Sequence, residues 1–258
     1  MVESRYDTIG IKQVIRLEWL EKTVNLLLAG FDAQLIRQEL FQYLSDQSIQ
    51  IQSEETRSFS VTILMKTWVT PDIGLSMFRD KCLSYLHNNP SASLAIHWGM
   101  VSAAYPFWFN VAKQIGRLLS LQDKITQTQI IKRLKEKYGD RQTISRYSKY
   151  VIRSFVDWGV LKDADKPGCY LKGISFEIDD PHISELLFEA ALHTLPEGRS
   201  ALAVLKSNPG LFPFKLPIIS SGSLSQTSKT IEIVRHGLDE DLVRLKNIGL
   251  FNEEKEGD

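Results

Sequence analysis

Polar side chains recur at a fixed spacing near the middle of the chain. Four of them follow the spacing i, i+4, i+7 and i+11: Gln142, Arg146, Lys149 and Arg153. A helix brings such positions onto one face. An arginine can donate two hydrogen bonds to guanine, a glutamine can pair with adenine, and a lysine can meet guanine or a phosphate. Ser145, near the start of this segment, can reach base edges or phosphates. The pattern predicts a helix face that reads the major groove of double-stranded DNA.

The opposite side of the same segment is apolar. Its hydrophobic members are Ile144 and the residues 7, 11 and 14 positions after it, which are Val151, Phe155 and Trp158. A surface helix with one apolar stripe and one polar stripe buries the former and exposes the latter. We therefore expect Phe155 and Trp158 in the core, where they would not serve as platforms for base stacking.

Charge is distributed unevenly along the chain, although Lys+Arg and Asp+Glu are equal at 31 each. Residues 124–153 hold nine Lys and Arg side chains against two carboxylates, a net charge of +7. Because the whole chain sums to zero, the remainder carries −7. Such segregation favours an anionic partner for this segment.

The residues around the basic segment predict the elements that would position it. "KIT" reads as a short extended stretch, Thr126 as a helix cap, and Gly139 as the end of the helix that Thr126 begins. After Trp158, "GVLKDADKPGCYLKG" has the turn residues of a hairpin. Further cations lie on the first helix and on the hairpin, where they would meet phosphates or an adjacent groove: Lys132, Lys135, Lys162, Lys166 and Lys172.

This order of elements resembles a winged helix-turn-helix: a helix over 107–121 is followed by a helix, a turn, a second helix and a two-stranded hairpin. "FVDWGVLKD" is similar to the way many recognition helices of that family leave at a glycine and enter the wing. The resemblance covers about seventy residues. It implies DNA binding, but winged helices also dock proteins, and basic helix faces are often only solvated. An adaptor whose basic face docks an acidic partner is the alternative, and RNA as a partner stays open.

A longer stretch is similar in the order of its elements to the small A protein of BREX phage-resistance systems. The likeness lies in "EWLEKTVNLLLAGFDAQLIRQELF", "TISRYSKYVIRSFVDWGVLKD" and "DDPHISELLFEAALHTL". It implies a mainly helical, non-enzymatic DNA-binding component of a bacterial defence system. This chain departs from that pattern after Ser207, a region for which the resemblance gives no role.

The fold class predicted for the whole chain is mainly α. We expect a helical-bundle N-terminal domain over 1–89, a winged-helix region over 90–178, a small α+β C-terminal part over 179–251 and a disordered acidic tail over 252–258. Single predictions include a helix over Ile11–Ala29, a short helix over Ser200–Lys206 and a strand in "KTIEIVRHG". The helices outside the basic segment would serve dimerisation, as in a homodimer, or contact with other subunits of a defence or regulatory complex.

Several activities find no support in the residues. The five histidines show no metal-ligand spacing, and the chain has no phosphate-binding glycine loop, no His-Glu-x-x-His and no Gly-x-Ser-x-Gly. The sequence therefore predicts no catalytic residues, no metal and no cofactor, with an enzyme as the third choice. Cys82 and Cys169 suit a reducing compartment. Without a secretory signal or a long apolar run, we expect a cytoplasmic protein that does not enter membranes.

Overall fold

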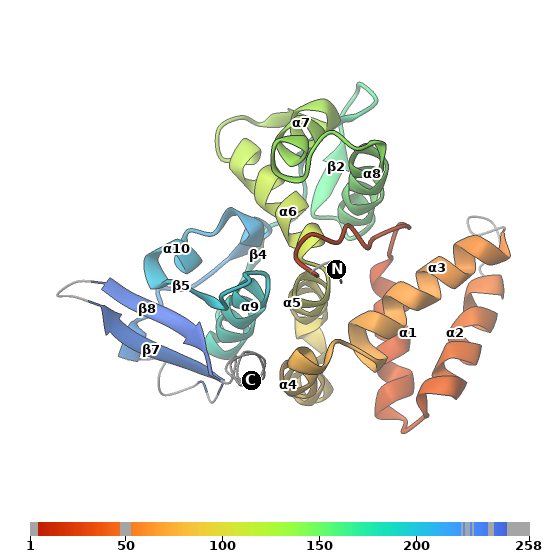
Figure 1. Cartoon of the computed structure of the whole chain (residues 1–258), viewed down its shortest axis with the longest axis horizontal. Helices are drawn as coiled ribbons and strands as arrows, with labels where there is room; N and C mark the ends of the chain where they lie inside the picture. The colour runs from red at the N-terminus through yellow and green to blue at the C-terminus, as the bar shows by residue number, and fades with distance from the viewer. Residues whose placement is uncertain are drawn as a thin grey trace, which may run out of the picture.

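The computed structural model describes residues 5–46, 53–222, 224, 228, 230–236 and 240–246. Over these ranges the chain is mainly helical with small sheets, which confirms the predicted fold class at that level (Figure 1). The predicted acidic tail, 252–258, lies outside the described residues. Apolar side chains from the N-terminal helices to the C-terminal strands join in one continuous buried core.

The N-terminal helices form an arm on one side of the molecule (Figure 1). They are α1 (Leu17–Leu28), α2 (Ala33–Asp46) and α3 (Glu54–Leu64), and α3 continues into a π-helical turn, η1 (Met65–Val69). Ser53 caps α3 by accepting a hydrogen bond from the amide of Thr56.

The helix predicted over Ile11–Ala29 is wrong at its start, because residues 11–16 are not helical. Ile11 and Ile15 are nevertheless fully buried. The amide of Ile15 donates to Oγ of Ser154 (2.9 Å), and its carbonyl accepts from the indole N–H of Trp158 (2.9 Å). Buried side chains four positions apart imitate a helix in the sequence, while distant polar partners hold this backbone.

The centre of the molecule is a set of closely packed helices. They are η2 (Ile73–Leu75), α4 (Ser76–Asn88), η3 (Pro90–Ala92), α5 (Ser93–Ala104) and α6 (Pro106–Leu119). Every residue of α5 from Ala95 to Ala104 is buried. A helix that is apolar on all sides must lie inside the protein, and α5 accordingly contacts α1, α4, α6 and α9.

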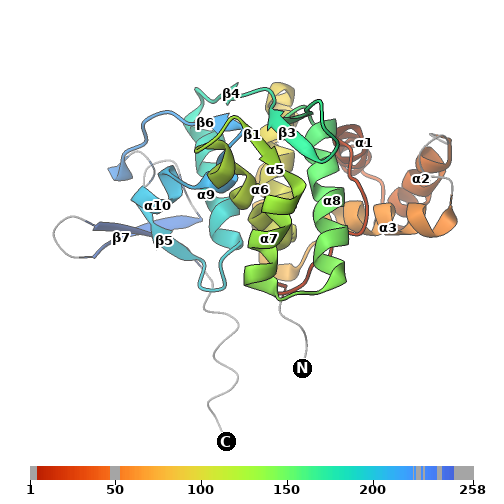
Figure 2. The same cartoon turned by 90° about the horizontal axis from the view of Figure 1, so that it is seen from above.

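The basic segment follows α6 as a compact group. It contains β1 (Lys124–Thr126), α7 (Gln127–Tyr138), α8 (Gln142–Asp157), β2 (Leu161–Asp163) and β3 (Cys169–Lys172). The strands form an antiparallel sheet in the order β1-β3-β2. Helices α7 and α8 contact each other, and both contact α6 (Figure 1 and Figure 2).

The C-terminal part mixes short strands with helices. In chain order it comprises β4 (Phe176–Glu177), α9 (Pro181–His193), β5 (Arg199–Ala201), α10 (Leu202–Lys206), η4 (Pro209–Leu211), β6 (Phe214–Lys215), β7 (Ile231–His236) and β8 (Glu240–Leu245). The strand predicted in "KTIEIVRHG" is confirmed as β7. The helix predicted over Ser200–Lys206 is wrong in its first residues, because Arg199–Ala201 pairs with β8 as a strand.

The C-terminal part is fixed to the back of α6. Gly116 lies in α6 where the chain at Pro209 crosses it, and a Cβ at this position would stand 1.9 Å from the carbonyl oxygen of Pro209. Only glycine allows this approach of two backbones. One flank of α6 therefore packs against η4, while α7 and α8 cover another.

Candidate nucleic-acid interface

The local sequence explains how α7 and α8 are held. Thr126 and Gln129 form a reciprocal capping box at the start of α7. Gly139 ends α7 with a φ of +85°, a left-handed conformation that side chains disfavour. Gly159, at φ +72°, turns the chain out of α8 into the hairpin. The predicted order of helix, short turn, helix and hairpin is present in the structure.

The apolar side of α8 is anchored in an aromatic cluster. Phe155 stacks on Trp98 with ring centroids 4.9 Å apart, and its edge-on contact with Trp108 has a centroid distance of 4.6 Å. Trp158 lies 5.0 Å from Trp108. Ile144 and Val151 are fully buried. The prediction that Phe155 and Trp158 belong to the core is confirmed, so the rotation of α8 about its axis is fixed by packing.

This rotation turns the polar stripe outward. The side chains at the predicted spacing are all exposed: Gln142, Arg146, Lys149 and Arg153. Ser145, beside the stripe, is half-buried. The structure thus places these residues on one solvent-facing side of α8, as a helix at this spacing requires.

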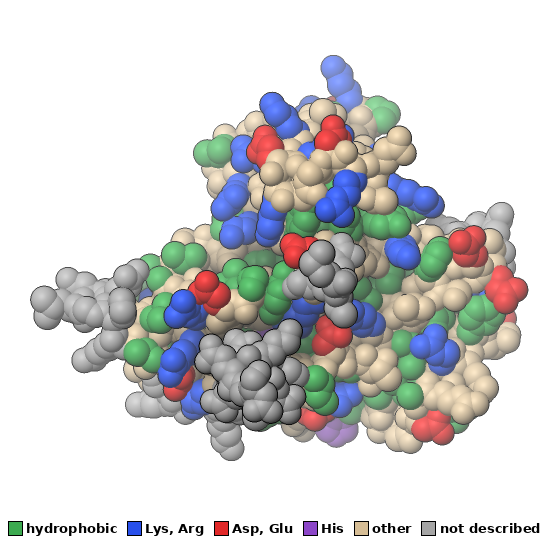
Figure 3. All heavy atoms as spheres, viewed as in Figure 1, with side chains coloured by type: hydrophobic (Ala, Val, Ile, Leu, Met, Phe, Trp, Pro, Cys, Tyr) green, Lys and Arg blue, Asp and Glu red, His purple; other side chains and the backbone are tan. Residues whose placement is uncertain are grey.

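The remaining predicted site residues flank α8 on both sides. Lys132 is exposed and Lys135 half-buried on α7, whereas Lys162, Lys166 and Lys172 are exposed on the hairpin. In Figure 3, Lys and Arg side chains gather over the region of α6–α8 and the hairpin.

Two of the predicted cations are engaged with carboxylates. Arg153 donates to both oxygens of Asp163 on β2, at 2.6 and 2.8 Å. Lys135 forms an ion pair with Asp140 at 2.6 Å. Arg146 instead donates from Nε to the Tyr150 hydroxyl at 3.5 Å. The cationic stripe is therefore strongest toward the N-terminal half of α8, and the carboxylate of Asp163 competes with any anionic partner for Arg153.

Sequence reasoning missed the residues that border the C-terminal half of α8. A pocket of about 320 Å³ separates this half from α3 and the segment before α1, and its lining includes Arg16, Thr56 and Arg153. Arg16 lies 3.8 Å from Asp157. Burial raises the pKa of Asp157, and Arg16 opposes that rise. No sequence signal pointed to Arg16, because it reaches α8 only through the irregular segment over 11–16.

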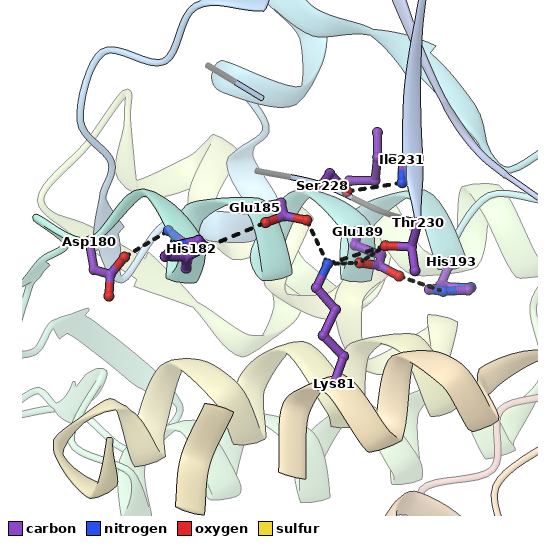
Figure 4. A network of polar contacts seen from close by, with 9 residues as sticks. All are labelled: Lys81, Asp180, His182, Glu185, Glu189, His193, Ser228, Thr230 and Ile231. Carbon is purple, nitrogen blue, oxygen red and sulfur yellow. Dashed lines mark hydrogen bonds and ion pairs between the residues drawn. The ribbon is translucent and has the colours of Figure 1, made fainter. Parts of the chain in front are cut away.

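A second polar cluster lies away from α8. Lys81 of α4 reaches between two carboxylates of α9, at 2.6 Å from Glu185 and 2.7 Å from Glu189 (Figure 4). The hydroxyl of Thr230 donates to Glu189 at 2.7 Å. Burial raises the pKa of Glu189, although Lys81 acts in the opposite direction. These contacts join α4, α9 and the start of β7, so the cluster ties the C-terminal strands to the central helices.

The described residues offer neither a metal-binding cluster nor a membrane-spanning helix. Within them, no three or more His, Cys, Asp or Glu side chains are arranged to hold a metal ion. No helix in the described ranges has the length and apolar character needed to cross a membrane.

Comparison with known proteins gives no relative: no family model, no curated protein and no solved structure matches this chain.

Proposed function

We propose that residues 106–172 form a winged helix-turn-helix and that this unit binds double-stranded DNA. In this assignment α8 is the recognition helix and the hairpin of β2 and β3 is the wing. The observation that carries the proposal is the exposed stripe on α8, whose cationic and amide side chains project together while the aromatic core holds the opposite face. The strand order β1-β3-β2, with β1 ahead of α7, supports the same assignment.

The proposed contacts follow from the chemistry of the groups. Arg146 and Lys149 enter the major groove, where guanine presents two acceptors, and Gln142 pairs with adenine. The lysines of α7 and the hairpin meet phosphates on either side: Lys132, Lys135, Lys162, Lys166 and Lys172. Phosphate contacts set the register, and the groove contacts supply whatever sequence preference exists. No step requires catalysis.

The resemblance to the small A protein of BREX systems suggests where such binding would act. We propose a role as a DNA-binding component of a bacterial phage-resistance system. A test is plaque formation by a restricted phage on cells with and without the gene, complemented by the wild-type chain.

Binding of random-sequence duplex DNA at rising salt tests the function directly. If roughly five cations meet phosphates, the logarithm of the binding constant should fall with the logarithm of salt concentration at a slope of about −4 to −5. Fluorescence anisotropy of a labelled duplex measures this slope. Absence of binding even at about 50 mM salt, where electrostatic association is strong, would reject the proposal and favour docking of an acidic protein.

The pair between Arg153 and Asp163 gives a gain-of-binding prediction. Asp163→Asn removes the competing carboxylate and releases Arg153. Because an exposed ion pair is worth at most about 1 kcal/mol, we expect duplex affinity to rise by roughly two- to fivefold. The salt slope should steepen by about one, as one more cation reaches a phosphate. Asp165→Asn, in the exposed loop between β2 and β3, is the matched control. An equal gain in both variants would show only a general effect of charge.

A further inference from the structure

A cation on α7 is held in a fixed position by a buried amide of α6. Lys137 donates from Nζ to Oδ1 of Asn110 at 2.9 Å. Asn110 is only 9% exposed, and its Nδ2 donates to the Tyr138 hydroxyl at 2.6 Å and to the carbonyl of Pro106 at 2.9 Å. With both ends of the amide engaged, Asn110 cannot turn away from Lys137. One of the three ammonium hydrogens is used, and the others stay available.

Two more cations share the face of α6 that receives Lys137. Asn110, Lys113 and Arg117 are spaced i, i+3 and i+7, so their side chains are neighbours on one side of the helix. An ammonium group bound to Asn110 therefore stands beside Lys113, and Arg117 lies one further turn along α6. We call Lys113, Arg117 and Lys137 the α6–α7 basic cluster.

The electrostatics of the cluster agree with this placement. Burial lowers the pKa of Lys113, and Arg117 lowers it further. Burial also lowers the pKa of Lys137, with added repulsion from Lys113 and Arg117, while Asp7 acts in the opposite direction. The fold thus holds like charges together. Lys113 and Arg117 lie on α6 and Lys137 on α7, so the cluster is on elements other than α8, which carries the recognition stripe.

We propose that the α6–α7 basic cluster binds a phosphoryl oxyanion. Two ammonium groups and a guanidinium offer the donors and the charge that such a group requires. The oxyanion comes either from a DNA backbone, as a second contact away from α8, or from free phosphate. Only the first source rests on the DNA binding proposed above.

The first experiment uses inorganic phosphate with the full chain. Thermal unfolding of the wild type, Lys113→Gln/Lys137→Gln and Lys12→Gln/Lys206→Gln is compared in sodium phosphate and in sodium chloride of equal ionic strength. Lys12 and Lys206 are exposed and lie on other elements, so the second double variant controls for net charge. Phosphate also stabilises proteins nonspecifically, and the control variant measures that part. We expect an extra rise in the melting temperature in the wild type and control that the cluster variant lacks.

The second experiment measures duplex binding against salt with the same three proteins. If the cluster contacts a DNA backbone, the plot of log binding constant against log salt concentration should be less steep for its variant, by about two in slope. A lost phosphate effect with an unchanged slope identifies free phosphate as the source. Equal phosphate effects in all three proteins, together with equal slopes in the two double variants, overturn the proposal. In chloride the cluster variant should unfold at or above the wild-type temperature because repulsion is relieved, which verifies that it folds.

Discussion

Replacing Arg146, Lys149 and Arg153 together by alanine is expected to weaken duplex DNA binding by at least about 100-fold. Each side chain is exposed on one face of α8, so each substitution would remove a proposed base or phosphate contact and no core contact. The salt slope should flatten by up to about three, one for each cation that had met a phosphate.

Stability should be nearly unchanged by this triple substitution. The strongest native contact that it removes is the exposed pair with Asp163, worth at most about 1 kcal/mol. Alanine also favours the helical conformation. The melting temperature, measured alongside anisotropy, therefore separates lost binding from lost folding. The matched control replaces three exposed cations on other elements by alanine: Lys12, Arg37 and Lys206. Undiminished binding by the α8 variant would remove α8 from the interface.

The largest expected effect on stability comes from Lys81→Met. Glu185 and Glu189 are 1% and 2% exposed at their side chains, and Lys81 is the cation that lies between them. Removing one partner from a buried ion pair leaves uncompensated charge and typically costs about 3–5 kcal/mol. We expect a loss of this size at neutral pH in denaturant unfolding, whereas Lys206→Met on an exposed site should have little effect.

The pH dependence of this loss has a definite sign. Burial already raises the pKa of Glu189 in the folded protein, so protonation favours folding, and that contribution disappears as pH rises through the folded pKa. Without Lys81 the pKa of Glu189 should rise further. The difference in unfolding free energy between Lys81→Met and the wild type should therefore shrink toward acid pH. Adding Glu189→Gln to Lys81→Met should recover part of the loss, because the amide carries no charge and still accepts from Thr230. A pH-independent difference would contradict this account.

The spacing of apolar residues within α8 predicted correctly which face of the helix is buried. Ile144, Val151 and Phe155 could be buried together only if Arg146 and Lys149 faced outward, and the structure has this arrangement. The same reasoning failed at Ile11 and Ile15, whose spacing also fits a helix. The irregular backbone at Ile15 depends on Ser154 and Trp158, which lie more than a hundred positions away.

Contacts between distant segments explain what else the sequence did not reveal. Lys81 meets carboxylates 104 and 108 positions away, and no periodicity relates such residues. Asp163 was assigned to the hairpin, but its two hydrogen bonds to Arg153 depend on how the hairpin folds back along α8. Strand β5 escaped prediction because it is short and acquires its conformation by pairing with β8.

The close approach at Gly116 has a consequence for attempts to transplant the proposed DNA-binding unit. A fragment spanning 106–172 would lose Pro209 and its neighbours, and the strip of α6 that they bury in the intact chain would face water. Grafted onto another protein, the fragment would expose this apolar surface. A Gly116→Ala substitution would also push α6 and the segment at Pro209 apart, because its methyl group would stand between the two backbones. Residues 106–172 thus depend on packing against residues 209–212, and a chimera that folds would have to include 209–212.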